Sequence, residues 1–85
     1  MKKVDIYTGI LCGYCNAAKK ILEKKNISFN EINISSNPDQ MEIMLKRSNG
    51  AKTVPQIFIG EMHVGGYDEL KALEVAGKLN SLLEN

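Results

Sequence analysis

The sequence predicts an α/β fold in which helices flank a four-stranded mixed sheet. Segments with a strand pattern alternate with segments of helical periodicity in the order β-α-β-α-β-β-α. The strand–helix–strand crossover makes the first two strands parallel, whereas the late hairpin is antiparallel, so the sheet is mixed. With 85 residues, 44% of them hydrophobic, the chain is long enough for one core but too short for two. We therefore expect a single domain over residues 1–85.

The first half of the chain predicts a strand, a helix and a second strand. Residues 4–8 are rich in β-branched and aromatic side chains and are followed by Gly9. Apolar residues then recur at helical spacing over residues 13–25, with polar residues on the opposite face, and Asn26 ends this helix. Residues 29–34 alternate well enough to form the second strand.

A second helix is predicted by the signals at its two ends. Asn37 can cap it, Pro38 suits the first helical position, and Gln40 stands where a capping box needs its partner. Gly50 should stop the helix in a left-handed conformation. The buried stripe of this helix consists of Met41, Met44 and Leu45.

The last part of the chain predicts a hairpin and a leucine-rich helical region. Residues 56–59 and 62–64 form short strands around a two-residue turn, Gly60-Glu61. The helical region that follows should break near Gly77. Its apolar face carries Leu70, Leu73, Leu79, Leu82 and Leu83.

Charge and hydropathy exclude several classes of function. The sequence contains eleven Lys and Arg residues and ten Asp and Glu residues, so it lacks the basic excess of a nucleic-acid-binding protein. The lysines at 19, 20, 24 and 25 form the solvated face of one helix. No stretch approaches the ~20 apolar residues of a membrane span, and Asp5 interrupts the apolar run that a signal peptide would need. We expect a monomer located in the reducing cytoplasm.

The chemistry is predicted to reside in the segment Cys12-Gly13-Tyr14-Cys15. Structural disulfides are rare in the cytoplasm, so a cysteine pair at this spacing is more often catalytic or metal-binding. Because the pair opens a helix after a strand, Cys12 lies at the positive end of the helix dipole and should lose its proton readily. Cys12 is then the nucleophile, and Cys15, one turn into the helix, is the resolving thiol.

Two other interpretations of the cysteines fit the sequence less well. A structural zinc site needs about four ligands, and beyond the two cysteines His63 is the one soft candidate in the sequence. Two inert buried cysteines would have no reason to stand at a strand-to-helix junction. A redox-active dithiol is the favoured hypothesis.

Thr53-Val54-Pro55 is the second candidate motif and precedes a strand. Proline cannot donate a hydrogen bond within a sheet, so it belongs at the start of that strand. A cis Val54–Pro55 bond would turn the Val54 backbone outward to pair with an extended peptide. An ordinary trans proline fits the tripeptide equally well, and the tripeptide alone does not choose between them.

Gly65-Gly66-Tyr67-Asp68 is the third candidate motif. Two glycines allow a ligand to approach the backbone closely, and Asp68 can cap the helix that follows. The N–H groups at this helix start can hold a ligand carboxylate, and the Asp68 side chain can accept an ammonium group.

The three motifs, in this order and spacing, resemble the glutaredoxins over nearly the whole chain. The resemblance implies a thioredoxin-like fold, a cis proline at Pro55 and reduction of protein–glutathione mixed disulfides and protein disulfides, with glutathione as the electron donor. Disulfide-bonded or glutathionylated proteins would be its partners. It also implies a glutathione groove formed by Tyr14, Thr53, Val54, Pro55, Gly66, Tyr67 and Asp68.

The sequence departs from many glutaredoxins at two positions. Gly13 replaces a proline, and family members with a small residue there sometimes hold a [2Fe–2S] cluster between two subunits, with Cys12 and glutathione as ligands. A glutathione-ligated cluster carrier or sensor is therefore the alternative function. Gly9 replaces a lysine that would hold the glycine carboxylate of glutathione. The candidate replacements for this cation are Lys46, Arg47 and Lys52.

Overall fold

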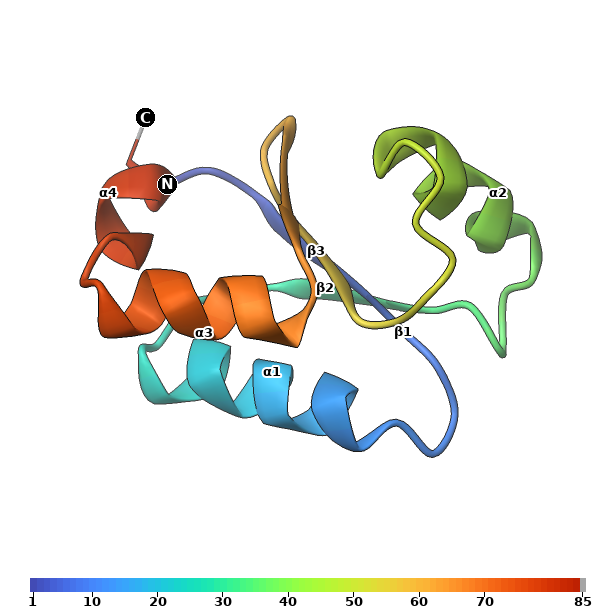
Figure 1. Cartoon of the computed structure of the whole chain (residues 1–85), viewed down its shortest axis with the longest axis horizontal. Helices are drawn as coiled ribbons and strands as arrows, with labels where there is room; N and C mark the ends of the chain where they lie inside the picture. The colour runs from blue at the N-terminus through green and yellow to red at the C-terminus, as the bar shows by residue number, and fades with distance from the viewer. Residues whose placement is uncertain (85) are drawn as a thin grey trace.

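A computed structural model describes residues 1–84 of the chain and shows a four-stranded mixed sheet with helices on both faces (Figure 1). The strands lie in the order β2-β1-β3-β4; β1 pairs with β2 in parallel, and the β1–β3 and β3–β4 pairs are antiparallel. The four strands, the parallel first pair and the antiparallel hairpin are as the sequence predicts. The elements are β1 (Val4–Thr8), α1 (Gly13–Lys24), β2 (Asn30–Asn33), α2 (Asp39–Arg47), β3 (Gln56–Ile59), β4 (Met62–Gly65), α3 (Tyr67–Val75) and α4 (Leu79–Leu83).

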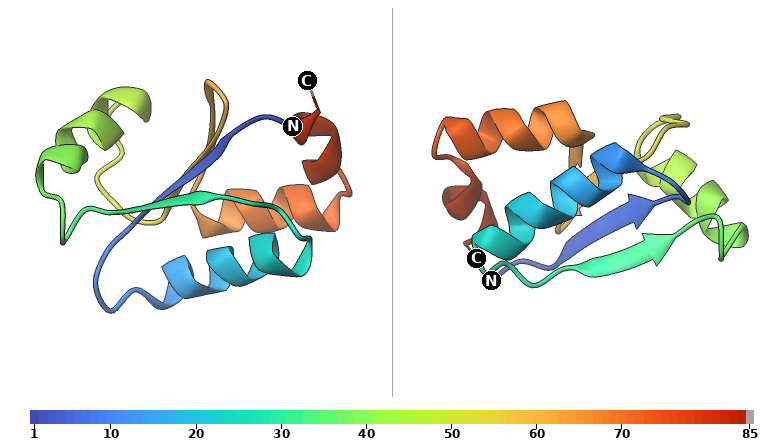
Figure 2. Two further views of the ribbon diagram at one scale, coloured as in Figure 1. Left: turned by 180° about the vertical axis from the view of Figure 1, so that it is seen from behind. Right: turned by 90° about the horizontal axis from the view of Figure 1, so that it is seen from below.

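Alternation along β1 divides the core between the two faces of the sheet. Helices α1 and α3 cover one face of the sheet and α2 covers the other (Figures 1 and 2). Val4 and Ile6 pack in the core with residues of α1 and α3, while Tyr7 packs with Met44 of α2. The first face is buried with Ala18, Leu22, Ile57, Ile59, Leu70, Leu79 and Leu83, and the second with Met44 and Phe58. Among residues 1–84 no helix is long and apolar enough to cross a membrane.

Helices α1 and α2 both end at an asparagine in the left-handed conformation. Asn26 has a φ of 57°, and the next N–H, that of Ile27, donates back to Leu22 O at 2.9 Å. At the end of α2 this place is taken by Asn49, with a φ of 58°, and Gly50 follows with a φ of 100°. Gly50 is left-handed as predicted, but the first left-handed residue after α2 is Asn49, one residue before the glycine that was expected to stop the helix. The break at Gly77, with a φ of 71°, is confirmed.

The predicted start of α2 is wrong in its details. The helix begins at Asp39, Pro38 precedes it, and no side chain caps it. Asn37 donates its side-chain amide to Asn33 O at 3.1 Å instead. Asn33 Oδ1 accepts the next free backbone N–H, that of Ser35, at 2.8 Å. This Asx turn at the end of β2 directs the chain into the helix, so a capping box with Gln40 is not formed.

Arg47 joins the last turn of α2 to the sheet. Its Nη1 lies 3.0 Å from both Asp5 Oδ2 and the Tyr7 hydroxyl, and its guanidinium lies 4.1 Å from the centre of the Phe58 ring. Burial opposes the charge, but the hydrogen bonds to Tyr7 and Asp5 outweigh it and raise the pKa of Arg47 above its usual value. Arg47 therefore has a structural role beneath α2.

Candidate active site

The first cysteine of the pair forms the N-cap of α1. Cys12 has extended backbone angles, and its Sγ accepts the N–H of Cys15 at 3.1 Å. The two cysteines form a disulfide, with Cys12 half-buried and Cys15 only 1% exposed. The helix has no acidic residue in its first turn. An anionic sulfur at position 12 would therefore meet free N–H groups and the helix dipole with no opposing carboxylate in that turn.

The Thr53-Val54-Pro55 loop lies directly beside the sulfur of Cys12. The Val54–Pro55 bond is cis, as the resemblance implies, and Pro55 is buried. Cys12 Sγ lies 3.8 Å from the carbonyl oxygen of Val54. A β-carbon on Gly9 would stand 3.1 Å from Val54 Cγ2, so this close approach leaves little room for a side chain at position 9.

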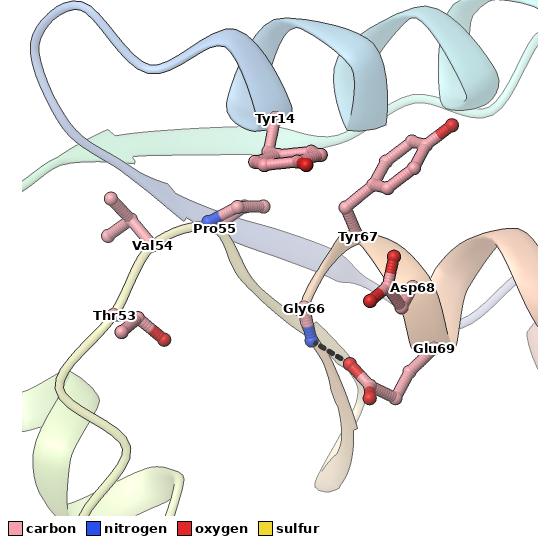
Figure 3. A pocket seen from close by; sticks show the side chains of 8 residues that line it. All are labelled: Tyr14, Thr53, Val54, Pro55, Gly66, Tyr67, Asp68 and Glu69. Atoms are coloured by element: carbon pink, nitrogen blue, oxygen red, sulfur yellow. Dashed lines mark hydrogen bonds between the residues drawn. The ribbon is translucent and has the colours of Figure 1, made fainter.

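A pocket of about 230 Å³ opens between the starts of α1 and α3 and the Thr53–Pro55 loop (Figure 3). All seven residues predicted to hold glutathione line it: Tyr14, Thr53, Val54, Pro55, Gly66, Tyr67 and Asp68. The rings of Tyr14 and Tyr67 stand 5.6 Å apart and tilted by 37°, one from each helix. The structure thus brings together three motifs that are far apart in the sequence.

Glu69 also lines this pocket, and sequence reasoning missed it. Its Oε1 accepts the N–H of Gly66 at 2.8 Å (Figure 3). Asp68 was expected to cap α3; the N-cap is Gly66 and the capping carboxylate is Glu69. The Gly-x-x-Glu spacing, which matches a capping box, was the signal that could have found it. Gly65 accommodates this contact: its φ is 120°, and a β-carbon there would stand 2.9 Å from Glu69 Cγ.

Gln56 is a second residue that the sequence did not reveal. It is buried at the start of β3, and its amide nitrogen donates to Thr53 O at 3.0 Å. Its amide oxygen lies 2.6 Å from Nε2 of His63, whose ring stacks on Phe58 at 4.8 Å. Gln56 therefore fixes the backbone of Thr53, which lines the pocket. The Nε2 atom of His63, which was the candidate metal ligand, is thus engaged by Gln56.

Comparison with known proteins identifies the family. A family model described as Glutaredoxin matches residues 4–64. The chain belongs to the glutaredoxin family. The glutaredoxin of Pseudomonas aeruginosa is 51% identical over 83 residues, which make up 98% of each chain. The solution structure of glutaredoxin from Brucella melitensis superposes with a TM-score of 0.83 at 52% identity, covering 98% of this chain and 89% of that one.

A structural neighbour with a bound ligand lies further away in sequence. The crystal structure of a buckwheat glutaredoxin–glutathione complex superposes with a TM-score of 0.84 at 30% identity, covering 96% of this chain and 76% of that one. The fold is thus thioredoxin-like, as predicted. As a glutaredoxin, the protein is a glutathione-dependent thiol–disulfide oxidoreductase with a Cys12–Cys15 dithiol.

The three cations predicted to hold the glycine carboxylate of glutathione differ in their surroundings. Arg47 is engaged by Asp5 and Tyr7 beneath α2, as described above. Lys46 and Lys52 are both exposed. Lys52 immediately precedes Thr53 in the loop that lines the pocket, whereas Lys46 lies in the last turn of α2.

Metal-ligating groups do not gather in the described part of this glutaredoxin. Within residues 1–84 no three His, Cys, Asp or Glu side chains lie close enough together to hold a metal ion. Iron–sulfur clusters are held by about four ligands, mostly thiolates. Cys15 is buried in the core side of α1, which leaves Cys12 as the accessible sulfur of the pair. The cluster alternative would draw Cys12 from each of two subunits together with glutathione, and the comparisons do not favour it over the oxidoreductase.

Proposed function

We propose that Cys12 is the nucleophile of this glutaredoxin, that Cys15 is its resolving thiol, and that the pocket beside them holds glutathione. The observation that carries the proposal is the position of Cys12 Sγ. It caps α1 through the N–H of Cys15 at 3.1 Å and lies 3.8 Å from Val54 O, which lines the pocket. A thiolate there is stabilised by the helix N-terminus and meets a bound disulfide.

The pocket matches the two ends of glutathione. With the glutathione sulfur at Cys12, the cysteinyl backbone lies along Val54. The γ-glutamyl group then reaches the start of α3, where the N–H groups of Tyr67 and Asp68 have no intrahelical partner and can bind its carboxylate. The Asp68 carboxylate accepts its ammonium group. The Gly66 N–H takes no part, because Glu69 already accepts it.

The remaining glutathione carboxylate needs a cation that Gly9 does not supply. Of the two exposed candidates, Lys52 is the better placed, since it adjoins Thr53. The glutathione complex of the buckwheat glutaredoxin supports a glutathione site in this fold.

Removal of glutathione from a protein requires one cysteine. The Cys12 thiolate attacks the glutathione sulfur of the mixed disulfide, and the protein thiolate leaves and takes up a proton. A second glutathione thiolate then attacks the Cys12-bound glutathione, which releases glutathione disulfide and restores the Cys12 thiolate. One free glutathione is thereby consumed for each mixed disulfide reduced, and it leaves as glutathione disulfide together with the glutathione that was bound to the protein.

Reduction of a protein disulfide requires both cysteines. Cys12 attacks one substrate sulfur and releases the other as a thiol. Cys15 then attacks Cys12 Sγ, which frees the substrate and leaves the Cys12–Cys15 disulfide seen in the structure. Two glutathione molecules reduce this disulfide and leave as glutathione disulfide. A cycle of this kind depends on a glutathione-rich compartment, which supports a cytoplasmic location and disulfide-bonded or glutathionylated proteins as partners.

Serine variants of the two cysteines test these roles. Cys15→Ser should keep most of the activity on a glutathione–cysteamine mixed disulfide but lose most reduction of a disulfide-bonded protein. Cys12→Ser should lose both activities by about a hundredfold or more. The measurement is a pair of steady-state rates for each variant. Equal loss of both activities in Cys15→Ser would refute the glutathione-centred mechanism.

A further inference from the structure

The loop between β1 and α1 presents two aliphatic side chains to solvent beside Cys12. Ile10 is 74% exposed and Leu11 is 99% exposed. The loop extends past the N-terminus of α1, on the side away from α3 (Figure 1). The pocket that we assign to glutathione is lined by other residues. Ile10 and Leu11 therefore form a separate apolar surface, called here the Ile10–Leu11 surface, next to the nucleophile.

Folding gives no reason for a leucine at position 11. Its φ of 52° places it in the left-handed conformation, which Gly and Asn adopt more readily than Leu. An apolar residue directly before an N-cap can pack on the fourth residue of the helix. That residue of α1 is Asn16, which is polar and exposed. Leu11 thus meets no backbone requirement and, at 99% exposure, packs on no partner among residues 1–84.

The loop is held so that these side chains stay in solvent. The N–H of Ile10 donates to Ser35 Oγ at 3.1 Å, which ties the loop to the start of the β2–α2 connection. Gly9 packs against Val54, since a β-carbon there would stand 3.1 Å from Val54 Cγ2. A surface fixed before binding loses less conformational entropy when a partner covers it.

The segment of chain that carries the Ile10–Leu11 surface is itself uncharged. Residues 8–18 contain no charged side chain, although charged residues make up 25% of the whole sequence. A partner would find no ion pair along this loop and first helical turn. Burial of apolar side chains is the interaction that the surface offers.

We infer that Ile10 and Leu11 bind apolar side chains that flank the reactive cysteine of a disulfide-bonded protein substrate. The inference rests on the proposed function, in which a substrate sulfur bonds directly to Cys12 Sγ. The residues beside that substrate cysteine must then lie along the two sides of Cys12. Val54 occupies one side, 3.8 Å from Cys12 Sγ, and Leu11 is the chain neighbour of Cys12 outside the pocket. Substrates with apolar residues beside the cysteine are therefore preferred.

Two matched peptides test this preference. Both are cyclised by a disulfide and differ only in the residues on each side of the cysteines, which are Leu in one and Ser in the other. For each enzyme kcat/KM is measured with glutathione as reductant and corrected for the uncatalysed reaction. The glutathione–cysteamine mixed disulfide, which carries no peptide, is the internal reference. The wild type should favour the Leu peptide by about tenfold, and an Ile10→Ser/Leu11→Ser variant should reduce this ratio to about one.

Two further variants keep the result open to refutation. Val75→Ser removes a side chain that is 73% exposed at the end of α3 and should leave the ratio unchanged. Leu11→Asn suits the left-handed backbone, so it should melt no lower than the wild type and still lose part of the preference. A wild-type ratio near one, or an unchanged ratio in the double variant, would overturn the inference. Failure of the wild type to turn over the glutathione–cysteamine reference would instead refute the proposed function.

Discussion

Two helix N-termini border the same pocket, and their first turns differ in charge (Figure 3). In α1 the N-cap is the sulfur of Cys12, and the first turn contains no acidic residue. In α3 the first turn contains both Asp68 and Glu69, and Glu69 accepts the N–H of Gly66 at 2.8 Å. A helix N-terminus stabilises negative charge in either case. What differs is whether a carboxylate of the protein already supplies that charge.

The difference in charge between the first turns of α1 and α3 agrees with the role proposed for each helix N-terminus. The sulfur of Cys12 must be anionic to react, so a carboxylate in the first turn of α1 would compete with it for the same N–H groups. In the proposed function, the start of α3 binds the amino acid end of glutathione, which carries both charges. One acid, Glu69, completes the fold there, while the neighbouring Asp68 is free to accept the ammonium group of the ligand.

Removal of the Asp68 charge should have the largest effect on this comparison. Asp68→Asn should raise KM for the glutathione–cysteamine disulfide by about tenfold, because a charge-assisted hydrogen bond to the ammonium group is lost. Its melting temperature should stay within about 2 °C of the wild type, since Asp68 is exposed. Asp39→Asn, in the first turn of α2, is the matched control and should keep the wild-type KM. If Asp68→Asn raised KM and also lowered the melting temperature by several degrees, the role of Asp68 would be structural.

Removal of the Glu69 side chain should act on stability instead. Glu69→Ala leaves the Gly66 N–H without its acceptor, which should cost ~1 kcal/mol of folding free energy. For a domain of this size the melting temperature should fall by about 4–8 °C. Calorimetry on Glu69→Ala and on the exposed hairpin control Glu61→Ala makes the measurement. An unchanged melting temperature for Glu69→Ala would show that the cap contributes nothing.

An acid can also be introduced at α1 to make its terminus resemble that of α3. A side chain at Gly13 meets no other atom within 4 Å, so Gly13→Asp should be accommodated. Its charge should slow iodoacetamide alkylation of reduced Cys12 at mildly acidic pH by roughly two- to fivefold. Asn80→Asp, which adds the same charge on α4, should keep the wild-type rate. Faster alkylation in Gly13→Asp would contradict the role assigned to the free terminus.

The sequence predicted those parts of the site whose position depends on local patterns. The ends of β1 and β4 and the start of β3 lie at one edge of the sheet, which brings Val54 and Asp68 to one pocket beside Cys12. The sequence offered the three motifs one by one, and the resemblance to the glutaredoxins implied that they share a groove. The sequence predicted Asp68, not Glu69, as the capping acid of α3, because the two acids are neighbours in the chain. Only their offset from the N-cap separates them, and the N-cap was itself placed two residues late.

Contacts between distant residues could not be predicted in the same way. Arg47 was one of three candidate cations, and nothing local shows that it is engaged by Asp5 and Tyr7, which stand 42 and 40 residues earlier in the chain. The contact between Gln56 and His63 depends on the pairing of β3 with β4, which has an irregularity between Ile57 and Phe58. A register set by such an irregularity leaves no periodic signal in the sequence.

The smallest effect concerns a carboxylate that belongs to neither terminus. The Thr8 hydroxyl donates to Glu31 Oε2 at 2.8 Å, and Lys19 Nζ lies 3.2 Å from the same oxygen. The hydrogen bond from Thr8 and, to a lesser extent, the charge of Lys19 outweigh burial and hold the pKa of Glu31 below its ordinary value. Because the pKa of Glu31 is lower in the folded state than in the unfolded state, its ionised form stabilises the fold at any pH above the unfolded-state pKa. This contribution is lost as the pH falls through the folded-state pKa.

Thr8→Val removes the larger of these causes and nearly keeps the shape of the buried side chain. The variant should melt below the wild type at neutral pH, and the difference should narrow as the pH falls below the ordinary pKa of a glutamate and Glu31 takes up its proton in both proteins. Thermal melts of both proteins across this pH range make the measurement, and Glu31→Gln, which cannot titrate, is the control. Because Glu31 is exposed, the solvent screens the interaction and keeps the effect small. A difference that stays constant with pH would show that Thr8 acts by packing at the end of β1. Glu31 would then play no part comparable to that of Glu69 at the start of α3.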